Sequence, residues 1–182
     1  MVKMNKEMGV VLLKLVVLSI VAAAILGAIY IPTQEQVIKY KQEQKELALS
    51  VVNPLADHFD PVKSKSGEEI LYYRALDADN NLIGYSFFRD QSGSQSVITL
   101  AGGIDTEYKV TGIKIMSHAE TPGLGAKIIE SAFTDQFKGV SESDLMLSKK
   151  GGAIDAITGA SISSQAVIDG IQSKINEIKA NE

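Results

Sequence analysis

The chain has 182 residues, a formal net charge of −4 and a pI of about 5.3. This length allows one domain of ordinary size with an appendage, and the charge does not suggest a nucleic-acid-binding protein, which would present a basic face. The absence of cysteine excludes iron–sulfur clusters, cysteine-ligated zinc and disulfides, and with two histidines we expect no metal or haem site built from histidine.

The N-terminal region carries a long apolar run from residue 10 to residue 31, VVLLKLVVLSIVAAAILGAIYI. As a helix rising 1.5 Å per residue, the run is about 33 Å long, which is enough to cross a bilayer's hydrocarbon core. Its single charge, Lys14, lies close to one end, where a lysine can reach the headgroups. The run therefore predicts a transmembrane helix over residues 10–31.

The orientation follows from the charges before this run. Lys3 and Lys6 place residues 1–9 in the cytoplasm as a short tail, with the rest of the chain on the outer side of the cell (inner) membrane. A cleaved signal peptide is the alternative, because the alanines at residues 22–24 offer a cleavage site. The run is longer than the apolar region of a usual signal peptide, so we favour an uncleaved, single-pass anchor.

Residues 32–54 are expected to form a stalk helix and linker. The polar segment 34–49 has a helical pattern and either continues the membrane helix, packs on a partner or is simply a solvated helix. Asn53-Pro54 is expected to end it.

Residues 55–182 are expected to form one folded extracytoplasmic domain. Alternating apolar residues predict four strands, the first two forming a hairpin, and period-two strands of this kind belong to antiparallel sheets. The expected strands are 70–76, 82–88, 96–104 and 108–117. A helix is expected over 126–133 and another after Ser164, whose apolar residues recur at helical spacing. The fold class is therefore α+β, with one antiparallel sheet and helices packed on one side.

Two segments of this domain are candidates for a ligand site. The first, HAETPGLG at residues 118–125, lies between a strand and a helix, and its proline and glycines suit a tight loop that a flat ligand can approach. Glu120 and Thr121 are expected at its rim. A loop of this kind is also common for purely structural reasons, and a lone His118 is more often a structural residue than a proton carrier.

The second segment is DAITGAS at residues 155–161, directly before the C-terminal helix. Free N–H groups and the positive end of the helix dipole favour a phosphate there. Small residues before Ser161 leave its hydroxyl open, so the pattern suits a hydroxyl that carries a phosphate. A serine-rich helix cap is the alternative interpretation of the same residues. Neither a GxGxxG dinucleotide motif nor a P-loop is present.

Together, the N-terminal anchor and the two segments in this order resemble the FMN-binding domain family, most closely the G subunits of Rnf-type ferredoxin:NAD oxidoreductases. The C subunit of the Na⁺-translocating NADH:quinone reductase is a relative of that family. The resemblance implies one covalent FMN per chain, attached through its phosphate to Ser161 by a Mg-dependent extracytoplasmic flavin transferase that binds transiently. It implies a redox subunit that relays electrons among other membrane subunits, coupled to Na⁺ or H⁺ translocation, with no catalytic residue and no metal site of its own.

The resemblance also gives the residues expected around the cofactor: Ser161, Asp155, Thr158, Gly159, Ala160, Ser163, His118, Glu120, Thr121, Pro122, Gly123, Leu124 and Gly125. Two departures from the family pattern are visible. The acceptor is serine where threonine is commoner, and residues 91–96 replace a glycine-rich turn. A stand-alone flavoprotein that donates electrons to a reductase, and a flavin-free anchored ectodomain, are the alternative functions.

Overall fold

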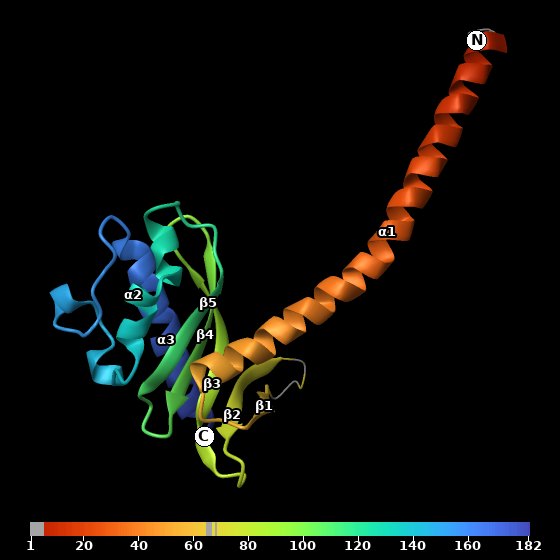
Figure 1. Cartoon of the computed structure of the whole chain (residues 1–182). Helices are drawn as coiled ribbons and strands as arrows, with labels where there is room; N and C mark the ends of the chain where they lie inside the picture. The colour runs from red at the N-terminus through yellow and green to blue at the C-terminus, as the bar shows by residue number, and fades with distance from the viewer. Residues whose placement is uncertain (1–5, 65–66, 68) are drawn as a thin grey trace. The chain divides into compact units, whose positions relative to one another are not determined.

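A computed structural model describes residues 6–64, 67 and 69–182 (Figure 1). Lys3 and the rest of segment 1–5 of the expected cytoplasmic tail lie outside the described residues. The chain divides into two compact units, Met1–Lys45 and Glu46–Glu182.

The first element is one continuous α-helix, α1 (Lys6–Val52). Its segment Met8–Ala28 is long and apolar enough to cross a membrane, with a mean hydropathy of 2.7. Pro32 does not interrupt the helix, which ends at Val52, immediately before Asn53-Pro54. The last turns, from Glu46 onward, belong to the second compact unit.

The second unit is built on a five-stranded sheet in which every strand pairs antiparallel with its neighbours in chain order. The strands are β1 (His58–Lys63), β2 (Ile70–Leu76), β3 (Leu82–Ser92), β4 (Val97–Asp105) and β5 (Val110–Ser117). This confirms the predicted antiparallel sheet. The edge strand β1 was not predicted, because Pro61 and its charged neighbours hide the alternation, and proline is tolerated in edge strands.

The long helix α3 (Ser161–Asn181) runs along one face of the sheet, as Figure 1 shows in blue. Short helical segments fill the connection from β5: η1 (Gly125–Ile129), α2 (Ser131–Thr134), η2 (Asp135–Phe137), η3 (Glu142–Asp144) and η4 (Ser148–Lys150). Between the sheet and these elements lies the main core, which includes Phe87, Leu100, Ile168 and Ile171, all fully buried.

The single helix predicted over 126–133 is wrong. Extended backbone at Glu130 separates the 3₁₀-helix η1 from the short α2. Ile128 and Phe133 are both buried in the core, yet five positions along a continuous α-helix would point them about 140° apart. The break at Glu130 lets both side chains reach the same core.

The prediction that helices pack on one side only is also wrong, because the end of α1 covers the opposite face. Ala48 and Val52 pack there against Ala101 of β4. Asn53 fixes this end: its side-chain amide donates to the Tyr85 carbonyl and the Ser86 hydroxyl at 3.0 and 2.8 Å. The Thr111 hydroxyl donates to the Asn53 side-chain oxygen at 2.7 Å.

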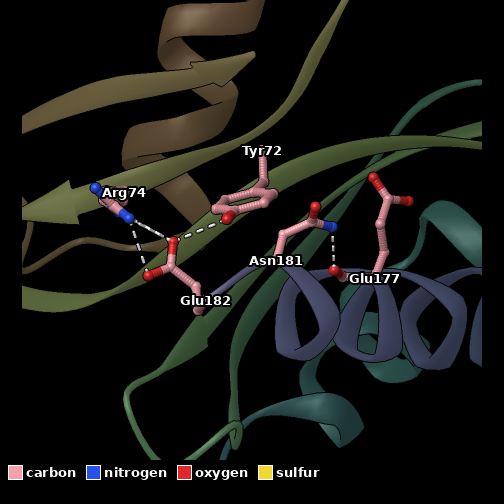
Figure 2. Close-up of polar contacts among 5 residues, drawn as sticks. All are labelled: Tyr72, Arg74, Glu177, Asn181 and Glu182. Atoms are coloured by element: carbon pink, nitrogen blue, oxygen red, sulfur yellow. Dashed lines mark hydrogen bonds and ion pairs between the residues drawn. The ribbon is translucent and has the colours of Figure 1, made fainter. Parts of the chain in front are cut away.

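The far end of α3 is tied to strand β2 by Glu182, as Figure 2 shows. Its carboxylate accepts hydrogen bonds from both Arg74, at 2.9–3.0 Å, and the Tyr72 hydroxyl, at 2.8 Å. Burial and the hydrogen bond to Glu182 raise the pKa of Tyr72, so this phenol stays protonated. The contact fixes the direction of α3 across the sheet and so helps to place its other end, where Ser161 lies.

Candidate functional site

Ser161 is the first residue of α3 and is partly buried. The preceding residue, Ala160, provides no side-chain cap, and the Ser164 N–H makes the first helical hydrogen bond, to the Ala160 carbonyl. Ser164 instead ties the helix to the segment before it, because its hydroxyl accepts from the Ile157 N–H at 3.0 Å. The positive end of the helix dipole is therefore open beside the Ser161 hydroxyl.

Glu120 links the two candidate segments from inside the domain. Its side chain is 4% exposed and accepts from the Ser163 hydroxyl at 2.6 Å. The same carboxylate accepts from the N–H groups of Ser94, Gln95 and Ser96, at 3.0–3.3 Å. Glu120 was expected at the rim of a ligand site, but it is buried and joins the β3–β4 turn to the first turn of α3.

Hydrogen bonds stabilise the ionised form of the Glu120 side chain. Burial alone would raise the pKa of this carboxyl, but the hydrogen bonds from Ser163, Gln95 and Ser96 outweigh it and lower the pKa to about 2. The group is thus ionised at neutral pH and holds two loops around one negative charge. His118 stabilises the loop that carries Glu120, since its Nδ1 accepts a hydrogen bond from the Glu120 N–H at 3.2 Å.

Close packing of glycines brings the rest of both segments together. A Cβ on Gly125 would lie 2.9 Å from the Ser163 hydroxyl and from Glu120, so this position has room only for glycine. Gly159 has a φ of +79°, a conformation that favours glycine. A Cβ there would lie 3.1 Å from the Leu124 side chain. The 120–125 loop therefore packs directly on the turn that precedes Ser161.

A shallow hollow of about 360 Å³ opens beside Ser161; we call it the Ser161 hollow. It is lined by Ser92, Leu147, Lys149, Lys150, Ser161, Ile162, Gln165, Ala166 and Asp169. The Lys149 ammonium lies 3.4 Å from the Ser161 hydroxyl oxygen, and the Lys150 ammonium donates to the Gln165 side chain at 3.2 Å. One positive charge thus lies beside the hydroxyl, and a second lines the same hollow one helical turn further along α3.

Each candidate segment also presents an exposed aliphatic side chain at or next to its end. Leu124 is 44% exposed and Ile162 is 65% exposed, although both are large aliphatic residues. Thr121, Pro122 and Gly123 in the loop are exposed as well, as are Thr158 and the Asp155 carboxylate in the other segment. Such a surface can carry a flat aromatic ligand on one side and leave its other side open.

The donor set fits a phosphorylated flavin. A hydroxyl, two ammonium groups and an uncapped helix start match a phosphate, and the adjacent apolar surface matches a ring system. Among the described residues, no cluster of three or more His, Cys, Asp or Glu could hold a metal ion.

Of the predicted residues, Glu120, Gly125 and Ser163 pack together, and Leu124 packs on Gly159, two positions before Ser161. Asp155 is exposed, and its backbone N–H donates to the Gln136 side-chain oxygen at 2.7 Å. Sequence reasoning missed Lys149 and Lys150. The signal that could have found them is a pair of lysines directly before the Gly151-Gly152 turn that leads into the second segment.

Comparison with known proteins gives a consistent result. Residues 93–176 match the model of the FMN-binding domain. The chain is 40% identical to the G subunit of the ion-translocating oxidoreductase complex of Methanosarcina acetivorans, over 98% of each chain. It is 30% identical to the G subunit of the Na⁺-translocating ferredoxin:NAD⁺ oxidoreductase complex of Acetobacterium woodii, covering 88% of this chain and 86% of that one.

The G subunit of the proton-translocating ferredoxin:NAD⁺ oxidoreductase complex of Clostridium ljungdahlii is also 30% identical and covers 87% and 84% of the two chains. Among solved structures, the C subunit of the Na⁺-translocating NADH-quinone reductase from Parabacteroides distasonis aligns with a TM-score of 0.57. The alignment covers 79% of this chain and 92% of that one at 19% identity. This likeness confirms the predicted α+β fold.

Proposed function

Because this chain belongs to the family of G subunits of ion-translocating oxidoreductase complexes, we propose that it carries FMN covalently, through a phosphoester at Ser161, and relays electrons within such a complex. The broader part of this function, an electron-transfer flavoprotein subunit of an oxidoreductase, follows from the family and from the FMN-binding domain. The attachment and its position are the parts that need a test.

The geometry of Ser161 carries the proposal. Its hydroxyl lies on the first turn of α3, beside an uncapped helix start and 3.4 Å from the Lys149 ammonium. Attachment would form a bond from the hydroxyl oxygen to the flavin phosphorus while the donor's phosphoanhydride bond breaks and the hydroxyl proton and the remaining nucleotide leave. The product phosphodiester would keep one negative charge beside these positive groups. Ser163 and Ser164 could not serve in this way, because both are buried and their hydroxyls already bond to Glu120 and the Ala160 carbonyl.

Each segment then has a distinct task. Ser161 anchors the cofactor, Gly159 keeps the approach to the hydroxyl free, and Glu120 locks the loop against the helix. Leu124 and Ile162 offer the exposed apolar surface on which the ring would lie. Bound FMN supplies the redox chemistry. A covalent anchor makes a deep pocket unnecessary, so the ring stays accessible to a redox partner.

The coupling to ion movement must involve other subunits. The membrane-spanning candidate Met8–Ala28 contains only Lys14 as a charged residue, and one helix of this kind is not an ion path by itself. Relatives named for Na⁺ and for proton translocation are equally similar to this chain, at 30% identity each. We therefore propose that this chain relays electrons and that other subunits of the complex move the ion.

The test is intact mass and peptide mapping of the chain co-expressed with a Mg-dependent flavin transferase. We expect a mass gain equal to FMN less one water, located on the peptide that contains Ser161. Ser161→Ala should give a folded chain without the adduct, whereas Ser163→Ala should still be loaded. An adduct on another residue, or none while the transferase modifies a control substrate, would refute the proposal. Stable co-purification with membrane subunits separates a member of a complex from a stand-alone flavoprotein.

A further inference from the structure

Lys149 and Lys150 differ in their partners from four other lysines of this domain. Lysines 109, 138, 174 and 179 each form an ion pair with a carboxylate. Lys149 and Lys150 instead donate to neutral oxygens of Ser161 and Gln165. Both side chains are exposed, so two positive charges stand at the mouth of the Ser161 hollow without a carboxylate as direct partner in the described residues.

The backbone of the turn at residues 147–152 holds these two lysines in place. They end the 3₁₀-helix η4, which Gly151 closes with a φ of +90°. A Cβ on Gly152 would lie 2.1 Å from the Met146 carbonyl oxygen, so the turn packs tightly on the segment before it. Leu147 anchors the same turn through its buried side chain and a bridge to Ile154. The lysines therefore project from a fixed turn rather than from a free loop.

The one carboxylate that lines the Ser161 hollow is far from the hydroxyl. Asp169 lies eight positions beyond Ser161 on α3, a rise of about 12 Å. It accepts from the Gln165 side chain at 2.8 Å, so Gln165 stands between it and Lys150. The end of the hollow at Ser161 is thus positive and the end at Asp169 is negative.

We propose that Lys149 and Lys150 form a cationic clamp for the phosphoester at Ser161, an inference that rests on the proposed function. Lys149 contacts a phosphoryl oxygen directly, because the phosphoryl oxygens lie close beyond a hydroxyl oxygen that its ammonium already reaches. Lys150 closes the hollow from the next position along η4. Both are positioning residues: they hold the linker and thereby fix where the ring can lie.

The experiment compares full-length chains in detergent: wild type, Lys149→Gln, Lys150→Gln, the double variant and Lys149→Arg. Lys109→Gln is the matched control, because Lys109 is also an exposed lysine. Its neighbour Tyr108 lies under the ammonium of Lys179, which belongs to the last turn of α3. This places Lys109 at the far end of a helix about 30 Å long. Each chain is incubated with Mg²⁺, the flavin nucleotide donor and a limiting amount of purified flavin transferase, and attachment is followed by intact mass. The flavin-carrying chains are then compared by ³¹P NMR.

We expect Lys149→Gln to load about threefold or more slowly and the double variant to be slower still. The ³¹P resonance of the loaded Lys149→Gln chain should move from its wild-type position. Lys149→Arg should load nearly as wild type, because the cation remains, and Lys109→Gln should match wild type in both measurements. Raising the salt concentration should slow wild type toward the double variant, since exposed charges are screened. Unchanged melting temperatures show that the variants are folded.

The outcomes separate the two ideas. A wild-type chain that takes no adduct at Ser161 overturns the proposed function itself. A wild-type chain that is loaded, with lysine variants that match it in rate and ³¹P resonance, overturns the clamp alone. Slow loading with an unmoved ³¹P resonance also overturns the clamp, because the lysines would then serve contact with the transferase and not with the phosphoester.

Discussion

Glu120 shows how one buried charge can organise a candidate site. A carboxylate that is 4% exposed would be costly without partners, yet it accepts hydrogen bonds from three backbone N–H groups and two hydroxyls. These bonds join the β3–β4 turn, the 120–125 loop and the first turn of α3. The Glu120 carboxylate therefore links three segments, one of which is the helical turn that begins at Ser161.

We predict that Glu120→Gln lowers the free energy of unfolding by about 2–3 kcal/mol, because an amide accepts fewer of these bonds and brings its own N–H groups toward donors. The stabilisation by Glu120 is complete above the ordinary pKa of 4.5 and is lost as the pH falls toward about 2, its pKa in the folded chain. The stability gap between wild type and variant should therefore narrow as the pH drops below about 5 and close near pH 2.

Urea unfolding of the full chain in detergent, repeated over this pH range, measures the gap. Glu107→Gln is the control, because its carboxylate is exposed and pairs only with an exposed lysine. A gap that stays constant with pH, or a Glu120→Gln chain as stable as wild type, would show that the carboxylate does not hold the loops together.

At the residue scale, the segments that contain the candidate residues were predicted better than the burial and contacts of each side chain. Ser161, Gly159 and Gly125 lie in the expected segments, and the two segments do meet. The burial of Glu120 could not be predicted, since glutamate is normally exposed and its donors come from the β3–β4 turn, 24 to 26 residues earlier. Lys149 and Lys150 were missed for the same reason: only the folded turn brings them to Ser161.

At the scale of elements, strands with clear alternation were predicted and irregular segments were not. β2 matches its predicted range of 70–76. The 3₁₀ segments between β5 and α3 carry no periodicity of their own, because each is too short to repeat a pattern. The contact of α1 with the sheet was not foreseen either, since it depends on glycines in two different strands.

Those glycines suggest a prediction about how the helix end docks. A Cβ on Gly103 of β4 would lie 2.4 Å from the Val52 carbonyl oxygen and 2.5 Å from the Thr111 hydroxyl. Gly103→Ala should therefore destabilise the domain by about 1–3 kcal/mol, because backbone has to shift to admit the methyl group. Gly27→Ala is the control, since nothing lies within 4 Å of that position. Equal urea midpoints for the two variants would show that the end of α1 does not need this close approach.

At the scale of the whole molecule, the chain combines an apolar helix with a domain whose candidate cofactor surface is open. The apolar segment and the family relatives indicate a membrane-associated protein. An exposed surface with Leu124 and Ile162 beside a tethering hydroxyl suits a carrier that meets partners in the same membrane. The proposed covalent anchor would also prevent loss of the flavin from a domain on the outer side.

The orientation is the last prediction: the N-terminus is cytoplasmic and the domain is extracytoplasmic. Because the chain has no cysteine, single cysteines at Asn5 and Ser143 can report each side without background. Ser143 is exposed, on the short η3 segment, and its replacement by cysteine keeps the side-chain size. In intact protoplasts, a membrane-impermeant maleimide should label Ser143→Cys, whereas Asn5→Cys should react only after lysis. The reverse pattern would place the domain in the cytoplasm. Labelling of both before lysis would show that the N-terminus is not cytoplasmic, whereas in the reverse pattern an extracytoplasmic transferase would have no route to Ser161.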